Sequence, residues 1–229
     1  MTKPIAVVTG ASKGIGRATA LRLAKTYDIV AIARSTDALQ SLTREIERLG
    51  GSCRPVTLDL RKAAAVSAAL ADIDAAVLVN NAGVGTLKPM LDLTSEQWSE
   101  MVDVNFNALF EVTRALLPAM IRRESGHVVF IGSIAGRSAF TGGSCYAATK
   151  HAVMAMAECL MLEVREHGVK VSVVNPGGVA TDFGSGRGDT SWKIVPEDVA
   201  EAVATVVDTP PNVLVHRLEV RALNVPKKK

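Results

Sequence analysis

Short apolar segments recur along the chain, and they are followed by longer segments in which apolar positions repeat every three or four residues. The apolar segments, rich in β-branched residues, lie at Ile5–Val8, Ile29–Ile32, Ala75–Val79, His127–Ile131 and Val169–Val174. The longer, helical segments lie near 15–26, 36–49, 62–71, 96–123, 145–167 and 196–207. This alternation predicts βαβ units. Because strands with helices on both faces are buried on both sides, the uninterrupted apolar runs predict a parallel sheet between two helical layers.

These elements predict an α/β fold in one domain that covers residues 1–229. We expect a Rossmann-type, doubly wound parallel sheet of about seven strands with helices on both faces. In such sheets, ligands bind beyond the carboxyl ends of the strands, so functional residues are expected just after each strand. The polar, glycine-rich segment 183–191 predicts a loop within a short substrate loop at about 182–193. Phe183 and Trp192 flank it and fit either a cover over an apolar substrate or core packing.

Composition excludes several classes of protein. The net charge of +3 arises from 26 basic and 23 acidic residues scattered along the chain. A nucleic-acid-binding protein would concentrate its basic residues on one surface, so no nucleic-acid partner is expected. No apolar run approaches the ~20 residues of a membrane span, and no signal-peptide core follows Met1. Cys53, Cys145 and Cys159 fit neither a zinc site nor a disulfide framework. We therefore expect a cytoplasmic protein without a membrane partner or a bound metal.

A glycine-rich segment, TGASKGIG at positions 9–16, follows the first predicted strand and begins the first predicted helix. Gly10, Gly14 and Gly16 let the backbone approach a phosphate group closely. The N-terminus of the helix adds free N–H groups and the positive end of its dipole. The segment therefore predicts a site for the pyrophosphate of a dinucleotide.

The spacing T-G-x-x-x-G-x-G resembles that of the short-chain dehydrogenase/reductase family, and further motifs of that family follow in order. They are NNAG at 80–83, Asn105, Ser133, Tyr146 with Lys150, and Pro176-Gly177. The resemblance covers residues 5 to 181. It implies an oxidoreductase whose catalytic residues are Asn105, Ser133, Tyr146 and Lys150, with Asn105 helping to hold a proton-relay water.

Tyr146 and Lys150 stand at positions i and i+4 near the start of a predicted helix, so their side chains project from one face. A free tyrosine has a pKa of about 10. A neighbouring ammonium, with the positive nicotinamide of an oxidised cofactor, is expected to bring the pKa of Tyr146 toward neutral pH. Tyr146 would then serve as general acid in reduction and general base in oxidation. Ser133 is expected to donate a hydrogen bond to the substrate oxygen.

The end of the second predicted strand indicates the cofactor. NAD-selective enzymes carry an acidic residue there, which binds the ribose 2′-hydroxyl. This chain has Arg34 and Ser35 instead, and a guanidinium suits a 2′-phosphate. Lys13 supplies a second positive charge, so NADP(H) is the expected cofactor.

The resemblance completes the expected cofactor site. It implies that Asp59 and Leu60 contact the adenine, that residues 81–83 lie beside the adenosine, and that Val179 and Thr181 contact the nicotinamide carboxamide. The full set is Gly10, Ser12, Lys13, Gly14, Ile15, Gly16, Arg34, Ser35, Asp59, Leu60, Asn81, Ala82, Gly83, Tyr146, Lys150, Pro176, Gly177, Val179 and Thr181.

The expected reaction interconverts a secondary alcohol and a ketone or aldehyde on a small molecule by hydride transfer. One alternative is a 3-oxoacyl-acyl-carrier-protein reductase, for which Arg122, Arg123 and His167 give mixed indications. Another is a non-catalytic NADP-binding sensor or scaffold, although silent relatives typically lack the tyrosine or the lysine. The long segments 96–123 and 145–167 resemble the helices through which the family forms dimers, so a homodimer is expected, with a homotetramer as the alternative.

Overall fold

The computed structural model describes residues 3–183 and 190–224, and in it seven strands form one parallel sheet. The strands are β1 (Ile5–Thr9), β2 (Asp28–Ala33), β3 (Cys53–Thr57), β4 (Ala75–Asn80), β5 (Gly126–Ile131), β6 (Val169–Pro176) and β7 (Arg217–Val220). Their order across the sheet is β3-β2-β1-β4-β5-β6-β7. The order reverses between β1 and β4, so the crevice expected to bind a ligand lies there. The predicted doubly wound α/β fold is confirmed.

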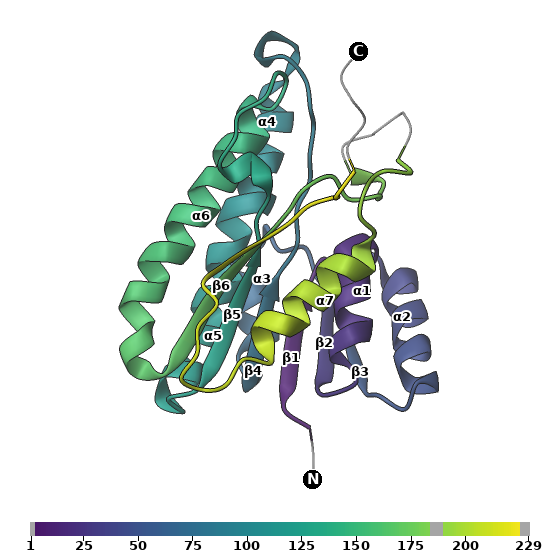
Figure 1. Ribbon diagram of the computed structural model, residues 1–229. Helices are drawn as coiled ribbons and strands as arrows, with labels where there is room; N and C mark the ends of the chain where they lie inside the picture. The colour runs from purple at the N-terminus through teal and green to yellow at the C-terminus, as the bar shows by residue number, and fades with distance from the viewer. Residues whose placement is uncertain (1–2, 184–189, 225–229) are drawn as a thin grey trace.

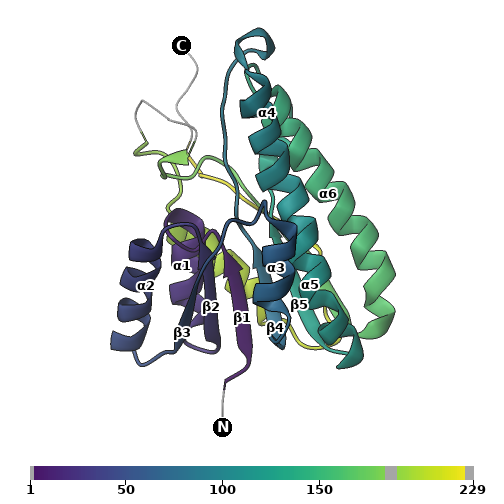
Figure 2. The same ribbon diagram turned by 180° about the vertical axis from the view of Figure 1, so that it is seen from behind.

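Helices cover both faces of the sheet (Figures 1 and 2). They are α1 (Gly14–Leu23), α2 (Thr36–Arg48), α3 (Ala63–Leu70), α4 (Ser95–Val102), α5 (Ala108–Arg122), α6 (Ser144–Val164) and α7 (Pro196–Val207). Helices α1, α2 and α7 pack on one face, and α3, α5 and α6 pack on the other. Both views show α4 and the first turns of α6 projecting beyond the carboxyl edge of the sheet, next to the ligand crevice.

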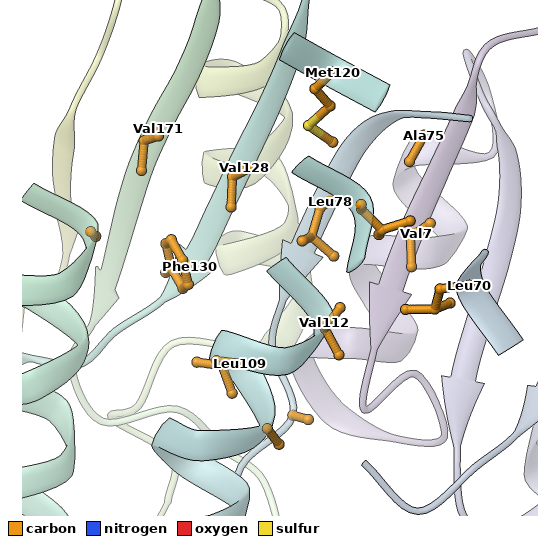
Figure 3. Close-up of a cluster of buried hydrophobic side chains, with 14 of the residues drawn as sticks. Val7, Leu70, Ala75, Leu78, Leu109, Val112, Met120, Val128, Phe130 and Val171 are labelled. Carbon is orange, nitrogen blue, oxygen red and sulfur yellow. The ribbon is translucent and has the colours of Figure 1, made fainter. Parts of the chain in front are cut away.

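Side chains of the central strands alternate between the two faces and fill two cores. In β4, Leu78 packs beneath α3, α5 and α6, whereas Val77 and Val79 pack beneath α1, α2 and α7. Phe130 of β5 is fully buried in the first of these cores, with Leu109 of α5 beside it in Figure 3. The uninterrupted apolar runs of the sequence therefore mark strands whose two faces are both buried.

The predicted helix 96–123 is wrong in one respect, because the structure divides it by a π-helical turn. Helix α4 ends at Val102, the π turn spans Asp103–Asn107, and α5 starts at Ala108. The N–H of Ala108 donates to the carbonyl of Asp103, five residues earlier, which is the π pattern. Apolar periodicity does not reveal one inserted residue, since the segments on either side keep their own helical spacing.

Two further observations concern membrane spans and metal sites. Within residues 3–183 and 190–224, no helix combines the length and apolar character needed to cross a membrane. The same residues contain no group of three or more His, Cys, Asp or Glu side chains that could hold a metal ion.

Candidate active site

The glycine-rich segment forms a tight turn between β1 and α1. Gly10 and Gly14 have φ angles of 65° and 55°, which strain any other residue. A Cβ on Gly16 would lie 2.4 Å from the side-chain nitrogen of Asn81 and from the carbonyl oxygen of Gly10. Lys13 stands at the N-cap of α1 without a side-chain cap. The first N–H groups of α1 are therefore available to an anion, as a pyrophosphate site requires.

Thr9 and Asn81 tie this turn to the end of β4. The buried Thr9 hydroxyl accepts hydrogen bonds from the N–H groups of Asn81 (2.9 Å) and Ala82 (3.0 Å). The Asn81 amide donates to the carbonyl oxygens of Thr9 (2.9 Å) and Gly10 (3.3 Å). Asn81 thus holds the backbone of the glycine-rich turn in place through these two carbonyl groups. The sequence analysis did not single out Thr9, because a β-branched residue in an apolar strand is typical of core packing.

Positive groups gather at the ends of β2 and β3. The Arg34 side chain is 60% exposed, with its Nη1 4.0 Å from Oε1 of Glu100. The carboxylate of Asp59 accepts from the Arg61 guanidinium at 2.6 Å, and these hydrogen bonds lower the pKa of Asp59 to about 2. Arg61, which carried no functional signal in the sequence, therefore pairs with the carboxylate of Asp59 near the end of β3.

The other predicted residues of this region occupy varied positions. Ser35 caps α2, its hydroxyl accepting from the N–H of Ala38 at 3.4 Å. Leu60 is buried, whereas Ser12 is half-buried in the glycine-rich turn. Lys13 is 73% exposed and forms an ion pair of 3.5 Å with Asp182. That ion pair links the glycine-rich turn to the segment that follows β6.

Tyr146 and Lys150 lie on one face of α6, as predicted. Lys150 is buried, and its Nζ donates at 2.8 Å to the carbonyl oxygen of Ile131, the last residue of β5. Its Nζ lies 5.8 Å from the centre of the Tyr146 ring. Burial lowers the pKa of Lys150 to about 8. A buried cation near a phenol favours the ionised form of that phenol.

The pKa of Tyr146 differs from the expectation in this structure. Burial raises it, and a hydrogen bond with Ser133 offsets that rise only in part. Desolvation of the phenol is the largest cause of this shift, and the lowering expected from Lys150 together with a positive nicotinamide stays a prediction. The hydrogen bond itself is the contact expected of a serine and a tyrosine that share one substrate oxygen.

Ser133 is held by the neighbouring strand. Its N–H donates to Oδ1 of Asn175 in β6 at 3.2 Å, and its hydroxyl accepts from the N–H of Ala135 at 3.1 Å. A Cβ on Gly132 would lie 2.2 Å from Oδ1 of Asn175, so only glycine allows this close approach. Asn175 is a second positioning residue that the sequence analysis missed, since it lies inside an apolar strand.

Asn105 sits in the π turn and is fully buried. Its Oδ1 accepts from the N–H of Val84 (2.8 Å), while its Nδ2 donates to the carbonyl of Val84 (2.9 Å) and to Oγ1 of Thr149 (3.3 Å). The Thr149 hydroxyl donates to the carbonyl of Tyr146 at 2.8 Å. The Asn105 side chain therefore fixes the loop after β4 against α6, and its role toward a water stays a prediction.

The segment after β6 closes the site. The N–H of Gly177, after Pro176, donates to the carbonyl of Val220 at 2.7 Å, and Val179 pairs with Ile194. A Cβ on Gly14 would lie 3.4 Å from the Thr181 methyl group, so the segment reaches the glycine-rich turn. Residues 184–189 of the predicted substrate loop lie outside the described residues. The structure thus brings the predicted residues to the carboxyl edge of the sheet.

Comparison with known proteins assigns the family. A family profile described as short chain dehydrogenase matches residues 4–191. The chain belongs to this family. The prediction of a short-chain dehydrogenase/reductase, and with it of an oxidoreductase, is confirmed.

Relatives of this family resemble the chain over nearly its whole length. It is 35% identical to the NADP-dependent 3-hydroxy acid dehydrogenase YdfG of Salmonella typhi, covering 94% of this chain and 93% of the relative. A closed form of serine dehydrogenase complexed with NADP+ is 33% identical, with a TM-score of 0.89 over 98% of this chain and 100% of that one. An alcohol dehydrogenase from the archaeon Thermococcus sibiricus, complexed with 5-hydroxy-NADP, is 30% identical, with a TM-score of 0.90 over 99% and 100% of the two chains.

Proposed function

We propose that the protein interconverts a secondary alcohol and a ketone or aldehyde on a small molecule, by hydride transfer with NADP(H) and with Tyr146 as general acid and base. The observation that carries this proposal is the arrangement of three side chains around the Tyr146 phenol. Ser133 lowers the pKa of this phenol, and the Nζ of the buried Lys150 lies 5.8 Å from the centre of its ring.

The expected cofactor, NADP(H), is confirmed by relatives that cover nearly the whole chain and whose descriptions name NADP. The residues of this chain fit it. The uncapped N-terminus of α1 and the glycine-rich turn suit the pyrophosphate. Arg34 and Lys13 are exposed cations at the two sides of the expected 2′-phosphate position.

Bound NADPH supplies the hydride when a ketone is reduced. Ser133 and Tyr146 donate hydrogen bonds to the carbonyl oxygen. These hydrogen bonds stabilise the negative charge that develops on this oxygen in the transition state. The Tyr146 phenol then transfers its proton to that oxygen, and in alcohol oxidation the phenolate takes the proton back. Lys150 stabilises this phenolate, because a cation held in a buried site interacts with it more strongly than in water.

The residues that gave mixed indications for the carrier-protein alternative lie at the opposite edge of the sheet. Helix α5 runs antiparallel to the strands, so its C-terminus reaches the amino edge. Arg123 there donates to the carbonyl of Ala75, the first residue of β4, at 2.8 Å. His167 immediately precedes Gly168 and β6. These residues therefore give no support to docking of a carrier protein at the site.

The test measures oxidation of NADPH and NADH by the purified protein with a panel of ketones, aldehydes, 2- and 3-oxo acids and 3-oxoacyl thioesters. Tyr146→Phe should abolish turnover while NADPH binding persists, because only the proton donor is removed. Tyr27→Phe, a change of the second tyrosine, is the matched control and should keep full activity. Arg34→Asp should shift preference toward NADH. Binding of NADPH without turnover of any compound would instead favour the non-catalytic sensor.

We also propose a homodimer formed through α5 and α6. Support comes from Leu162 on α6, a large apolar side chain that is 54% exposed. Light scattering of the purified protein should give twice the chain mass, and Leu162→Asp should reduce it to one chain mass. A mass of four chains, or of one chain in the wild type, would contradict the proposal.

A further inference from the structure

Phe183 packs against Tyr146 just after the segment that closes the site. The two ring centres are 5.4 Å apart, and the ring planes are tilted by 55°. This is a common geometry for an attractive aromatic pair. Phe183 nevertheless remains 42% exposed, so its ring is not part of the core and lies at the surface beside the tyrosine.

Gly85 forms the other side of this contact. A Cβ on Gly85 would lie 2.5 Å from one carbon of the Phe183 ring, so the ring rests on the bare backbone. That backbone is firmly placed, since Asn105 binds both the N–H and the carbonyl of the preceding residue, Val84. The position of the Phe183 ring is thereby set by two elements, the loop after β4 and the start of α6.

We infer that Phe183 determines substrate specificity, because its ring bounds the site beside Tyr146 and limits the size of the apolar group attached to the carbonyl carbon. The inference rests on the proposed function, in which the carbonyl oxygen comes within ~3 Å of the Tyr146 hydroxyl. With that oxygen so placed, a substituent of the carbonyl carbon passes next to the ring that covers Tyr146. A small group fits there, whereas a large one must displace the ring from its contact with Gly85.

The first experiment compares methyl ketones whose second substituent grows from methyl to phenyl. The measured quantity is kcat/KM for the ketone with a phenyl substituent divided by kcat/KM for the ketone with two methyl groups. Phe183→Ala should raise this ratio on the order of tenfold, the usual effect of a small change in an apolar pocket. Leu49→Ala is the control, since Leu49 is a large apolar residue that is 71% exposed at the end of α2, outside the site and outside α5 and α6. It should leave the ratio unchanged.

The second experiment uses Gly85→Ala. The added methyl group should push the Phe183 ring from its position and change the size preference of the wild type. In the Phe183→Ala background, the same substitution should have no further effect, because no ring is left to move. An effect of equal size in both backgrounds would show that Gly85 acts independently of Phe183 and would overturn the inference.

A binding measurement separates failure of this inference from failure of the proposed function. The affinity of each ketone for the NADPH complex is followed through the fluorescence of the bound nicotinamide. If turnover occurs but Phe183→Ala and Leu49→Ala give the same size preference, the inference falls and the function stands. If no ketone is turned over, the function falls, and a selective gain in affinity for the phenyl ketone in Phe183→Ala still supports the inference. Absence of that gain overturns it.

Discussion

Thr9 offers a sharp test of how the glycine-rich turn is held. Its side chain is fully buried at the end of β1, and valine has nearly the same shape without the hydroxyl. In Thr9→Val, the N–H of Asn81 keeps a second acceptor, the carbonyl of Val79 at 3.1 Å. Among the described residues, the N–H of Ala82 loses the acceptor that it has at 3.0 Å. The substitution thus leaves one buried donor unpaired.

A buried donor without a partner reduces the free energy of unfolding by ~1–3 kcal/mol. For a chain of this length, each kcal/mol shifts Tm by ~2–4 °C, so Thr9→Val should melt about 2–12 °C lower. Thr19→Val is the matched control. Thr19 is also fully buried, but its hydroxyl has no hydrogen-bond partner within the described part of the chain. Its replacement should leave stability unchanged or raise it by up to ~1–3 kcal/mol.

Urea unfolding followed by circular dichroism measures both variants, and fluorescence titration measures their affinity for NADPH. Thr9→Val should also bind NADPH more weakly, because the turn and residues 81–82 lose their common anchor. Thr9→Ser keeps the hydroxyl and should retain that affinity. Equal stability of Thr9→Val and Thr19→Val would refute the reasoning, as would a Thr9→Ser variant that binds NADPH as weakly as Thr9→Val.

Three further predictions concern charge and packing. Asp182→Asn removes the ion pair with Lys13, so it should strengthen NADPH binding by ~1.4- to 5-fold, the range of an exposed ion pair. Calorimetry should show no such gain for NADH or in a Lys13→Ala background. Burial and the nearby Lys170 lower the pKa of His127 to about 4, so between pH 6.5 and 4 only the unfolded chain gains a proton there. The free energy of unfolding should therefore fall by at most ~3 kcal/mol as the pH is lowered through this range; urea unfolding of His127→Gln should show a smaller fall, and an unchanged slope would contradict the assignment. Phe130→Ala should reduce the free energy of unfolding by ~3–5 kcal/mol, whereas Leu49→Ala, at an exposed position at the end of α2, should change it by less than ~0.5 kcal/mol; similar losses in both would contradict the burial of Phe130 in the core.

The fold could be predicted where helices cover both faces of a strand. The two edge strands are different: β3, with sequence CRPVT, has exposed and half-buried positions, and β7, RLEV, alternates between them. Neither forms an apolar run, so the pattern that revealed the central strands did not reveal these two. Their place follows from pairing with β2 and β6, which a single sequence does not state.

The sequence alone could predict the positions of the candidate reacting side chains, but not those of the residues that support them. Tyr146, Lys150 and Ser133 belong to motifs with fixed spacing. Thr9 and Asn175 act through backbone groups of segments far away in the sequence, so no local pattern marks them. The place of Arg123 could not be predicted either. Its position in the chain made Arg123 a candidate for docking a partner, but the direction of α5 carries this residue to the edge opposite the site.

The π turn at Asp103–Asn107 gives the helical segment from α4 to α5 one residue more than its packing requires. Met101 and Leu109 are both buried and stand eight positions apart, whereas two turns of a regular α-helix take ~7.2 residues. Deletion of Asn105 would bring these two side chains to seven positions, still on one face, in an uninterrupted helix. The core would survive this loss, but Val84 would be released. One inserted residue thus holds the loop after β4 against α6, while the helices on either side keep their packing.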